Sequence, residues 1–246
     1  MFVYSIYYMT EIIDFGDNYL PHILIKDILF LKQKYLFTLG IFGFNDILNY
    51  LKNENMEEIY KKEYLTYDNK PIDNFYDKYK FYTQSPKIVN TKFNFGFSHH
   101  FNYDVSNNCI NNYNYVVEQL NNRISEFKNV LNNEKKLIFV NFSFYSSLKN
   151  MKIDEMMNTL NGMISKKYYM FIFLYDYERL SNNINEEYDD FCKELFNKHN
   201  NIKIIFLKSD FSDWWKQTEN VKRVLYGEIC EGFLKACSDF NITIYK

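Results

Sequence analysis

The sequence predicts an α/β fold of three layers, in which a mainly parallel β-sheet is flanked by helices. From residue 111 onward, segments with apolar residues spaced three and four apart alternate with short apolar runs. Strands that alternate with helices of this length imply crossover connections, which favour parallel pairing. Hydrophobic residues make up 47% of the 246 residues, which is enough for the core of one α/β domain over 1–246.

The N-terminal part begins with the same rhythm of strand, turn and helix, over residues 11–15, 16–18 and 20–31. Residues 35–39 predict a second short strand, and Asn45 is expected to cap a helix over 46–51. Residues 52–90 then break the pattern, because they are charged, rich in Tyr, Asn and Lys, and contain two prolines. We expect this stretch to be an irregular or small helical insertion.

After residue 111 each predicted element follows from its spacing. The first helix, capped by Asn111 or Asn112, carries an apolar stripe, and two further helical stripes and a C-terminal helix over 221–237 follow. The stripes are Val116, Leu120, Ile124, Phe127 and Leu131, then Ile153, Met156, Met157, Leu160 and Ile164, then Ile184, Tyr188, Phe191, Cys192, Leu195 and Phe196. The strands between them are predicted at 137–142, 168–174 and 202–207, with a short one at 242–245. The first three should be adjacent or near-adjacent and parallel, because crossover helices return the chain in one direction.

Composition excludes several classes of protein. The formal charge is −2, from 29 basic and 31 acidic residues that are scattered along the chain, so no positive stripe is expected to bind nucleic acid. The four cysteines have no CxxC spacing, which is typical of reduced thiols. The start of the chain lacks the features of a signal peptide, and the longest apolar run is too short to span a bilayer. We therefore expect a cytoplasmic protein that does not bind membranes.

His99 and His100 lie next to each other in an aromatic stretch, with Asp104 close behind. Imidazole titrates near neutral pH, so this pair could serve acid/base chemistry or bind a metal. The alternative is a loop whose histidines only form local hydrogen bonds. No helical i,i+4 ligand spacing accompanies the pair, and we expect neither a metal nor a cofactor. A thiol and imidazole dyad with Cys109 is also conceivable, but it rests only on proximity in sequence.

The turn after the first strand is a second candidate site. Ligands of parallel α/β sheets bind outside the carboxyl ends of the strands, where Asp17 and Asn18 are expected. The alternative is that these residues only turn the chain and cap the next helix. Trp214 and Trp215, the only tryptophans, could bind a ligand or partner, or could be buried against the sheet.

The order of these motifs resembles a family of large DNA viruses and some bacteria that is described as papain-like cysteine peptidases. The family pattern runs from Ser-Leu-Gly-x-x-Cys after a strand, through Pro-Phe-Asp-Trp and Phe-x-His-Asp-Phe, to an arginine-bearing helix and an apolar strand. The similar segments here are 14–19, 36–39, 97–101, the helix with Arg123 and Phe127, the strand 137–140 and a tryptophan-containing tail at 213–215.

The resemblance implies a degenerate member of that family. Tyr19 stands at the position of the cysteine and Thr38 at that of the aspartate, which leaves only His99 of the implied catalytic group. A tyrosine hydroxyl titrates near ~10 and cannot replace a thiolate at neutral pH. The resemblance therefore implies a loss of thiol chemistry, and the alternation of strand and helix favours a parallel α/β fold over a papain fold.

Together these features predict a non-catalytic accessory or host-interaction protein of a virus or an AT-rich organism, which binds an unknown protein partner. The composition, rich in Phe, Tyr, Asn, Lys and Ile, is typical of AT-rich genomes. The alternative is a hydrolase or transferase that uses His99 or His100 with Asp17 in a polar cleft, with Asn18, Tyr19 and Trp214 as candidate ligand-binding residues. The two classes can be distinguished by the placement of these residues. An enzyme needs them together in one pocket, whereas a binding protein needs an exposed aromatic patch.

Overall fold

A four-stranded parallel sheet forms the centre of the computed structural model. The model describes residues 10–15, 36–39, 43–68, 87–97, 101–175, 185–208 and 218–242. The strands are β1 (Thr10–Asp14), β7 (Lys136–Phe144), β8 (Tyr168–Tyr175) and β9 (Ile202–Phe206), and they lie side by side in the order β1-β7-β8-β9. All three pairings are parallel. The predicted α/β fold and the adjacent, parallel placement of its last three strands are confirmed.

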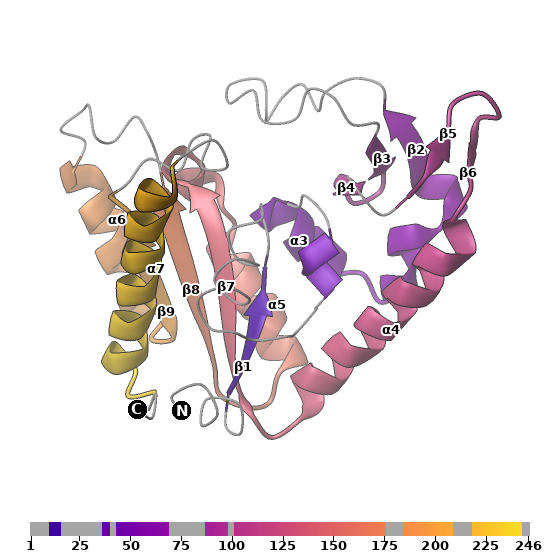
Figure 1. Cartoon of the computed structure of the whole chain (residues 1–246). Helices are drawn as coiled ribbons and strands as arrows, with labels where there is room; N and C mark the ends of the chain where they lie inside the picture. Colours follow the sequence, from indigo (N-terminus) through magenta and orange to yellow (C-terminus); the bar gives the residue numbers. More distant parts are fainter. Residues whose placement is uncertain are drawn as a thin grey trace, which may run out of the picture.

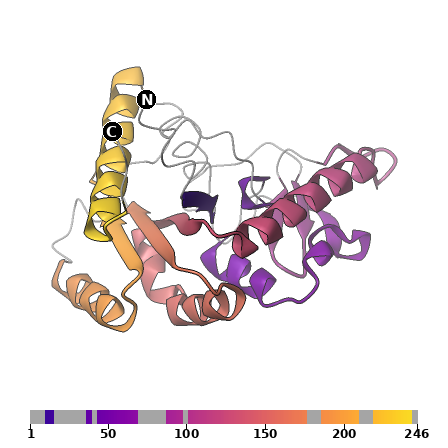
Figure 2. The same cartoon turned by 90° about the horizontal axis from the view of Figure 1, so that it is seen from below.

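Helices cover both faces of this sheet, as seen in Figure 2. The helices are α3 (Phe44–Leu51), α4 (Tyr113–Asn132), α5 (Ile153–Met163), α6 (Asn185–Lys198) and α7 (Glu219–Asp239). Each of the connections through α4, α5 and α6 leads to the neighbouring strand, and all three advance across the sheet in the same direction. Because such crossovers are right-handed, they place their helices on one face, together with α3, and α7 covers the opposite face.

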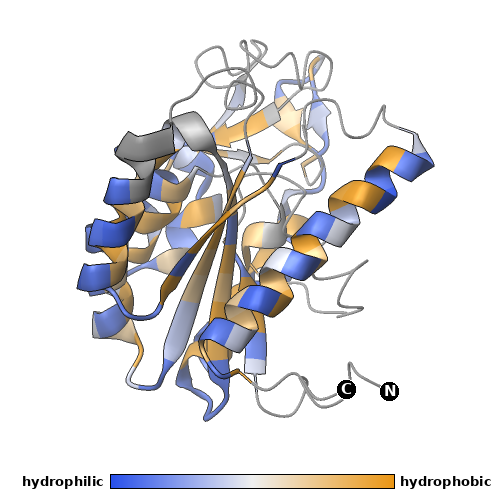
Figure 3. Cartoon of the chain, turned by 90° about the vertical axis from the view of Figure 1, so that its left-hand side faces the viewer, coloured by the Kyte–Doolittle hydropathy of each residue, from blue (hydrophilic) through white to orange (hydrophobic). Residues whose placement is uncertain are grey.

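Alternation along the strands explains the two cores. On β7, Leu137 and Phe139 point into the core shared with α3, α4, α5 and α6, whereas Ile138 and Val140 point toward α7. The strands are accordingly largely apolar, whereas hydrophilic and hydrophobic residues alternate along the helices beside them (Figure 3). Gly232 on α7 lies so close to β9 that a Cβ atom there would be 2.6 Å from the Ile205 Cγ2. A side chain at position 232 would therefore force Ile205 to shift at this contact between helix and strand.

The first two predicted helical stripes agree with the observed burial, and in the third Cys192 and Leu195 are buried whereas Phe191 and Phe196 are half-buried. All five stripe residues of α4 are buried, and so are Ile153, Met156, Met157 and Leu160 of α5. Asn112 is the N-cap residue of α4, but its side chain makes no capping bond. Instead its Oδ1 accepts a hydrogen bond of 2.7 Å from the backbone N–H of Asn102. Among the described residues, no helix is both long and apolar enough to cross a membrane.

The prediction for residues 52–90 is partly wrong. The described part of this stretch contains two 3-10 helices, Met56–Tyr60 and Lys62–Tyr64, but also the strands β2 (Leu65–Asp68) and β3 (Lys87–Asn90). These strands form an antiparallel sheet with β4 (Phe95–Phe97), which follows. A hairpin of β5 (Tyr103–Asp104) and β6 (Cys109–Ile110) follows. We call these described parts of 56–68, 87–97 and 101–112 the distal module, because they gather around the far end of α4 (Figure 1).

Two local predictions in the N-terminal part are also wrong. Leu36–Leu39 is a 3-10 helix and not a strand, which reflects the fact that a short apolar run cannot be assigned from periodicity. Asn45 does not cap α3, which begins one residue earlier behind Gly43. Its amide instead bridges to the α5 side, where it donates to the Asn150 carbonyl and accepts from the Lys152 N–H. The predicted helix over 20–31 lies outside the described residues, as does nearly all of the predicted strand over 242–245.

Candidate functional site

The residues of the predicted polar cleft lie outside the described part of the chain. These are Asp17, Asn18, Tyr19, His99, His100 and Trp214. The structure therefore describes their flanks, and the cleft itself stays a prediction. Those flanks, together with the polar groups beside them, form the described part of the candidate site.

Aromatic rings link several segments that carry the family resemblance. Phe15, which follows β1, contacts Phe37 of the 3-10 helix at 5.4 Å between ring centroids and Phe139 of β7 at 4.6 Å. Phe37 in turn contacts Phe127 of α4 at 5.5 Å. The N-terminal motif, the 36–39 segment, the helix and the strand thus share one aromatic core, although about 120 residues separate the first from the last.

The two flanks of the histidine pair join the same core. Phe97 ends β4 and Phe101 begins the next described segment, and their rings make an edge contact at 5.2 Å. Both residues belong to the buried cluster that contains Phe15 and Phe37. The chain therefore enters and leaves the histidine pair from a buried aromatic anchor, which fixes both ends of that short segment.

A group of buried polar residues lies where β1 and β7 end, and the sequence analysis missed it. Asp14 and Ser143 are 1% exposed and Asn141 is completely buried. The Asn141 Nδ2 donates a hydrogen bond of 2.6 Å to the Phe15 carbonyl, and its Oδ1 accepts one of 2.7 Å from the Ser143 hydroxyl. We call Asp14, Phe15, Asn141 and Ser143 the carboxyl edge. The sequence did offer a signal, because Asp14 interrupts the apolar run 12–15, and Asn141 and Ser143 interrupt the apolar run 137–144.

Strand alternation separates these polar groups into two sets. Asn141 and Ser143 share the face of Phe139, on the side of α4 and α5. Asp14 shares the face of Ile12, on the side of α7. The carboxylate and the amide–hydroxyl pair consequently do not form one catalytic constellation. Asn141 holds the carbonyl of Phe15 by its hydrogen bond. It thereby fixes the backbone at the end of β1, two residues before Asp17 in the sequence.

Asp104 and Cys109 are described, and among the described residues their side chains form hydrogen bonds with residues of the β5–β6 hairpin and its end. The Asp104 carboxylate closes the β5–β6 turn by accepting from the backbone N–H groups of Ser106 and Asn107, at 2.9 and 3.1 Å. Hydrogen bonds, first of all from the side chain of Asn107, lower the pKa of Asp104. Cys109 is exposed on the same hairpin, where its thiol contacts the Asn111 Oδ1 at 3.3 Å. Within the described ranges, no three His, Cys, Asp or Glu side chains are placed to hold a metal ion.

Two further perturbed groups have structural explanations. Burial raises the pKa of Asp46 to about 6, and its carboxylate accepts the Gly43 N–H at 3.1 Å at the start of α3. This is one half of a helix capping box, because Gly43 has no side chain to accept a bond in return. Arg123, which matches the arginine of the resembling family, is half-buried on α4, and this burial lowers its pKa. A perturbed pKa marks a candidate functional group, but structural interactions produce the same effect.

No protein-family model, curated protein or solved structure matches this chain. The fold and the site therefore define a class of protein and no more. That class is an α/β protein with a parallel sheet, a polar carboxyl edge and an antiparallel distal module.

Proposed function

We propose that this protein is a non-catalytic accessory protein that binds a protein partner through its distal module. The observation that carries the proposal is a pair of exposed apolar side chains at the far end of α4. Val105, in the turn of the β5–β6 hairpin, is 65% exposed, and Tyr115, in the first turn of α4, is 64% exposed. Large apolar side chains in a protruding, well-ordered place are typical of protein-binding surfaces.

The hairpin that presents Val105 is held in one shape. Asp104 closes its turn, and the backbone N–H of Asn111 donates to the Asn102 carbonyl at 2.9 Å, which closes the base of the hairpin. The Asn112 side chain, at the start of α4, accepts from the Asn102 N–H and ties the hairpin to this helix. Tyr103 stacks on Tyr67 of β2 with ring centroids 4.0 Å apart. A surface fixed in this way loses little conformational entropy when a partner binds, which favours affinity.

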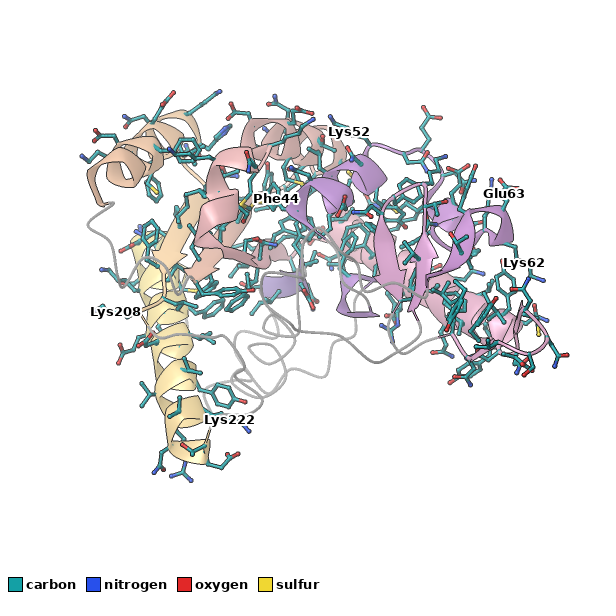
Figure 4. The ribbon with its side chains drawn as sticks, turned by 90° about the horizontal axis from the view of Figure 1, so that it is seen from above. Phe44, Lys52, Lys62, Glu63, Lys208 and Lys222 are labelled. Atoms are coloured by element: carbon teal, nitrogen blue, oxygen red, sulfur yellow. The ribbon has the colours of Figure 1, made fainter. Side chains whose placement is uncertain are left out.

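The charges of the distal module favour a protein partner over a nucleic acid. Glu58 forms ion pairs with both Lys61 and Lys92, and these contacts lower its pKa to about 2. Lys62 lies over the Tyr113 ring at 4.5 Å, and Lys62 and its neighbour Glu63 both point outward (Figure 4). Phosphate binding needs cations that are not already neutralised, whereas a mixed surface of aromatic and charged groups suits a protein.

Site-specific photo-crosslinking tests this proposal. A photoreactive phenylalanine analogue at position 105 or 115 should form discrete adducts with one protein from cells of the host or source. Val224 on α7, which is 60% exposed, provides the matched control position on the other side of the molecule. The same adducts at 224, or none at 105 and 115, would contradict the proposal. With the partner purified, Val105→Ser and Tyr115→Ser should each weaken binding about 10-fold or more.

A second candidate function is a hydrolase or transferase that uses Asp17 with His99 or His100. The observation that favours it is the polar carboxyl edge, because Asn141 fixes the chain at Phe15, two residues before Asp17. If Asp17 faces either imidazole, its charge favours the imidazolium and raises the pKa of that histidine. The histidine ring protons of Asp17→Asn should then titrate at lower pH than those of the wild type in an NMR titration. Unchanged midpoints for both histidines would remove this candidate.

A further inference from the structure

A pocket at the amino ends of the strands is independent of both proposed sites. It has a volume of about 420 Å³, within the usual range for small-molecule sites. The loops that lead from α5 into β8 and from α6 into β9 form its walls, with residues of the last turn of each helix. It therefore lies at the opposite end of the sheet from Asp14 and Asn141.

The lining of this pocket is basic. Three lysines (Lys166, Lys167 and Lys198), His199 and four asparagines contribute to it, and no carboxylate does so among the residues that the structure describes. In a chain whose formal net charge is −2, this is a local concentration of positive charge. A concave surface lined by one sign of charge raises the local concentration of ligands of the opposite sign.

Most of these cations are held in place by groups behind the pocket. The Lys166 ammonium donates to the carbonyls of Val130 and Asn133 at 2.8 and 2.6 Å. Asp154, at the start of α5, binds the side chains of both Lys198 and His199, the latter at 2.6 Å. These contacts stabilise the last turns of α4 and α6, as cations commonly do at helix C-termini. Such structural duties explain three of the four basic side chains.

Among the residues that the structure describes, the Lys167 side chain makes no such hydrogen bond or ion pair. It lies four residues beyond the end of α5, it is exposed, and its ammonium lies 5.3 Å from the centroid of the Tyr169 ring. Within the described ranges no carboxylate pairs with it. A lysine with no acceptor among the described residues, beside the Lys166 ammonium that is held by neutral carbonyl groups, is suited to contact an added anion.

We propose that this amino-edge pocket binds a small molecule that carries a phosphate group. The lining offers lysine ammonium groups and asparagine amide N–H groups and, in the described part of the chain, no arginine. Compact ammonium charges and amide donors suit the tetrahedral oxygens of phosphate, which carries more negative charge than a carboxylate and is attracted more strongly by several lysines. The proposal does not depend on the distal module or on the carboxyl edge.

Isothermal titration with pyrophosphate, at constant ionic strength, tests this inference. The wild type should bind with a measurable heat, and Lys167→Gln should weaken binding at least 10-fold. Lys193→Gln is the matched control, because Lys193 is an exposed lysine of α6 that pairs with Asp190 and does not line the pocket. The backbone amide signals of Asn200 and Asn201 should shift in NMR spectra during the titration.

Three outcomes would overturn the proposal. The first is no binding by the wild type. The second is an equal loss in Lys167→Gln and Lys193→Gln, which would indicate general attraction by surface charge. The third is equally tight binding of succinate, which would reject phosphate as the recognised group. Because Lys167 is exposed, its variant should fold normally, and circular dichroism would verify this.

Discussion

Replacing Asn90 with alanine is expected to lower the free energy of unfolding by about 3 kcal/mol. The side chain of Asn90 is completely buried and uses its full hydrogen-bonding capacity. Its amide nitrogen donates to the carbonyls of Glu58 and Ile59 at 3.0 and 2.8 Å, and its oxygen accepts from the N–H groups of Lys92 and Phe93 at 3.0 Å each. Alanine would remove all four bonds and leave buried backbone groups without these partners.

Urea denaturation of Asn90→Ala, with Thr91→Ala as the control, would measure this effect. Thr91 is the next residue, and its exposed hydroxyl donates only one hydrogen bond, of 3.2 Å, to the Tyr64 carbonyl. Its loss should cost less than about 1 kcal/mol, because water can replace the bond. Equal losses for the two variants would show that Asn90 does not hold the distal module together. Weaker partner binding by Asn90→Ala would be expected as well, since the same bonds position the antiparallel strands.

Replacing Asn141 with alanine should cost about 2 kcal/mol and loosen the end of β1. The variant removes the 2.6 Å bond to the Phe15 carbonyl and the 2.7 Å bond from the Ser143 hydroxyl, both of them buried. Local loosening is expected because Phe15 is also held to β7 through its own N–H, at 2.8 Å from the Val140 carbonyl. Once the carbonyl is released, that neighbouring bond should open more often.

Hydrogen exchange at the Phe15 amide, together with urea denaturation, checks the second prediction. Asn201→Ala is a suitable control, because the Asn201 amide is half-buried and makes a single bond of 3.2 Å to the Tyr168 carbonyl at the other end of the sheet. The control should lose less than about 1 kcal/mol and leave exchange at Phe15 unchanged. If Asn141→Ala exchanged at Phe15 like the wild type, Asn141 would not be the residue that anchors this end of β1.

The two variants also separate the two candidate functions. Asn90→Ala disturbs the distal module and should affect binding at Val105 and Tyr115. Asn141→Ala disturbs the carboxyl edge and should affect any chemistry of Asp17. The amino-edge pocket is built by α5, α6 and the loops after them, and phosphate binding should survive both changes.

Short-range patterns were sufficient for the parallel sheet and its helices. The apolar stripe of α4 was predicted residue by residue, because a helix places residues three and four apart on one face wherever that face is buried. The strand over 168–174 was predicted because a strand covered on both faces is apolar throughout. Parallel pairing was predicted because each connection is long enough to hold a helix. Such right-handed crossovers return the chain to the same end of the sheet.

The distal module could not be predicted in the same way. Its strands contain only two to four residues, and β2 pairs with β3 across an interval of about twenty residues. Such strands are too short for periodicity to show, and they are stabilised by contacts that arise only once the chain is folded. Asn90 illustrates this, since its partners at Glu58 and Ile59 lie about thirty residues earlier.

By itself, then, the sequence determined that 137–142, 168–174 and 202–207 form parallel strands and which faces of α4 and α5 are buried, since these depend on residues close together in the chain. Only the tertiary structure decided that Leu36–Leu39 is a 3-10 helix, that Asn45 bridges to α5, and that Asn141 closes the end of β1. The physical reason is that a polar or short apolar segment can adopt several local conformations of similar free energy. The choice among them is made by hydrogen-bond partners and packing surfaces that lie far away in the chain.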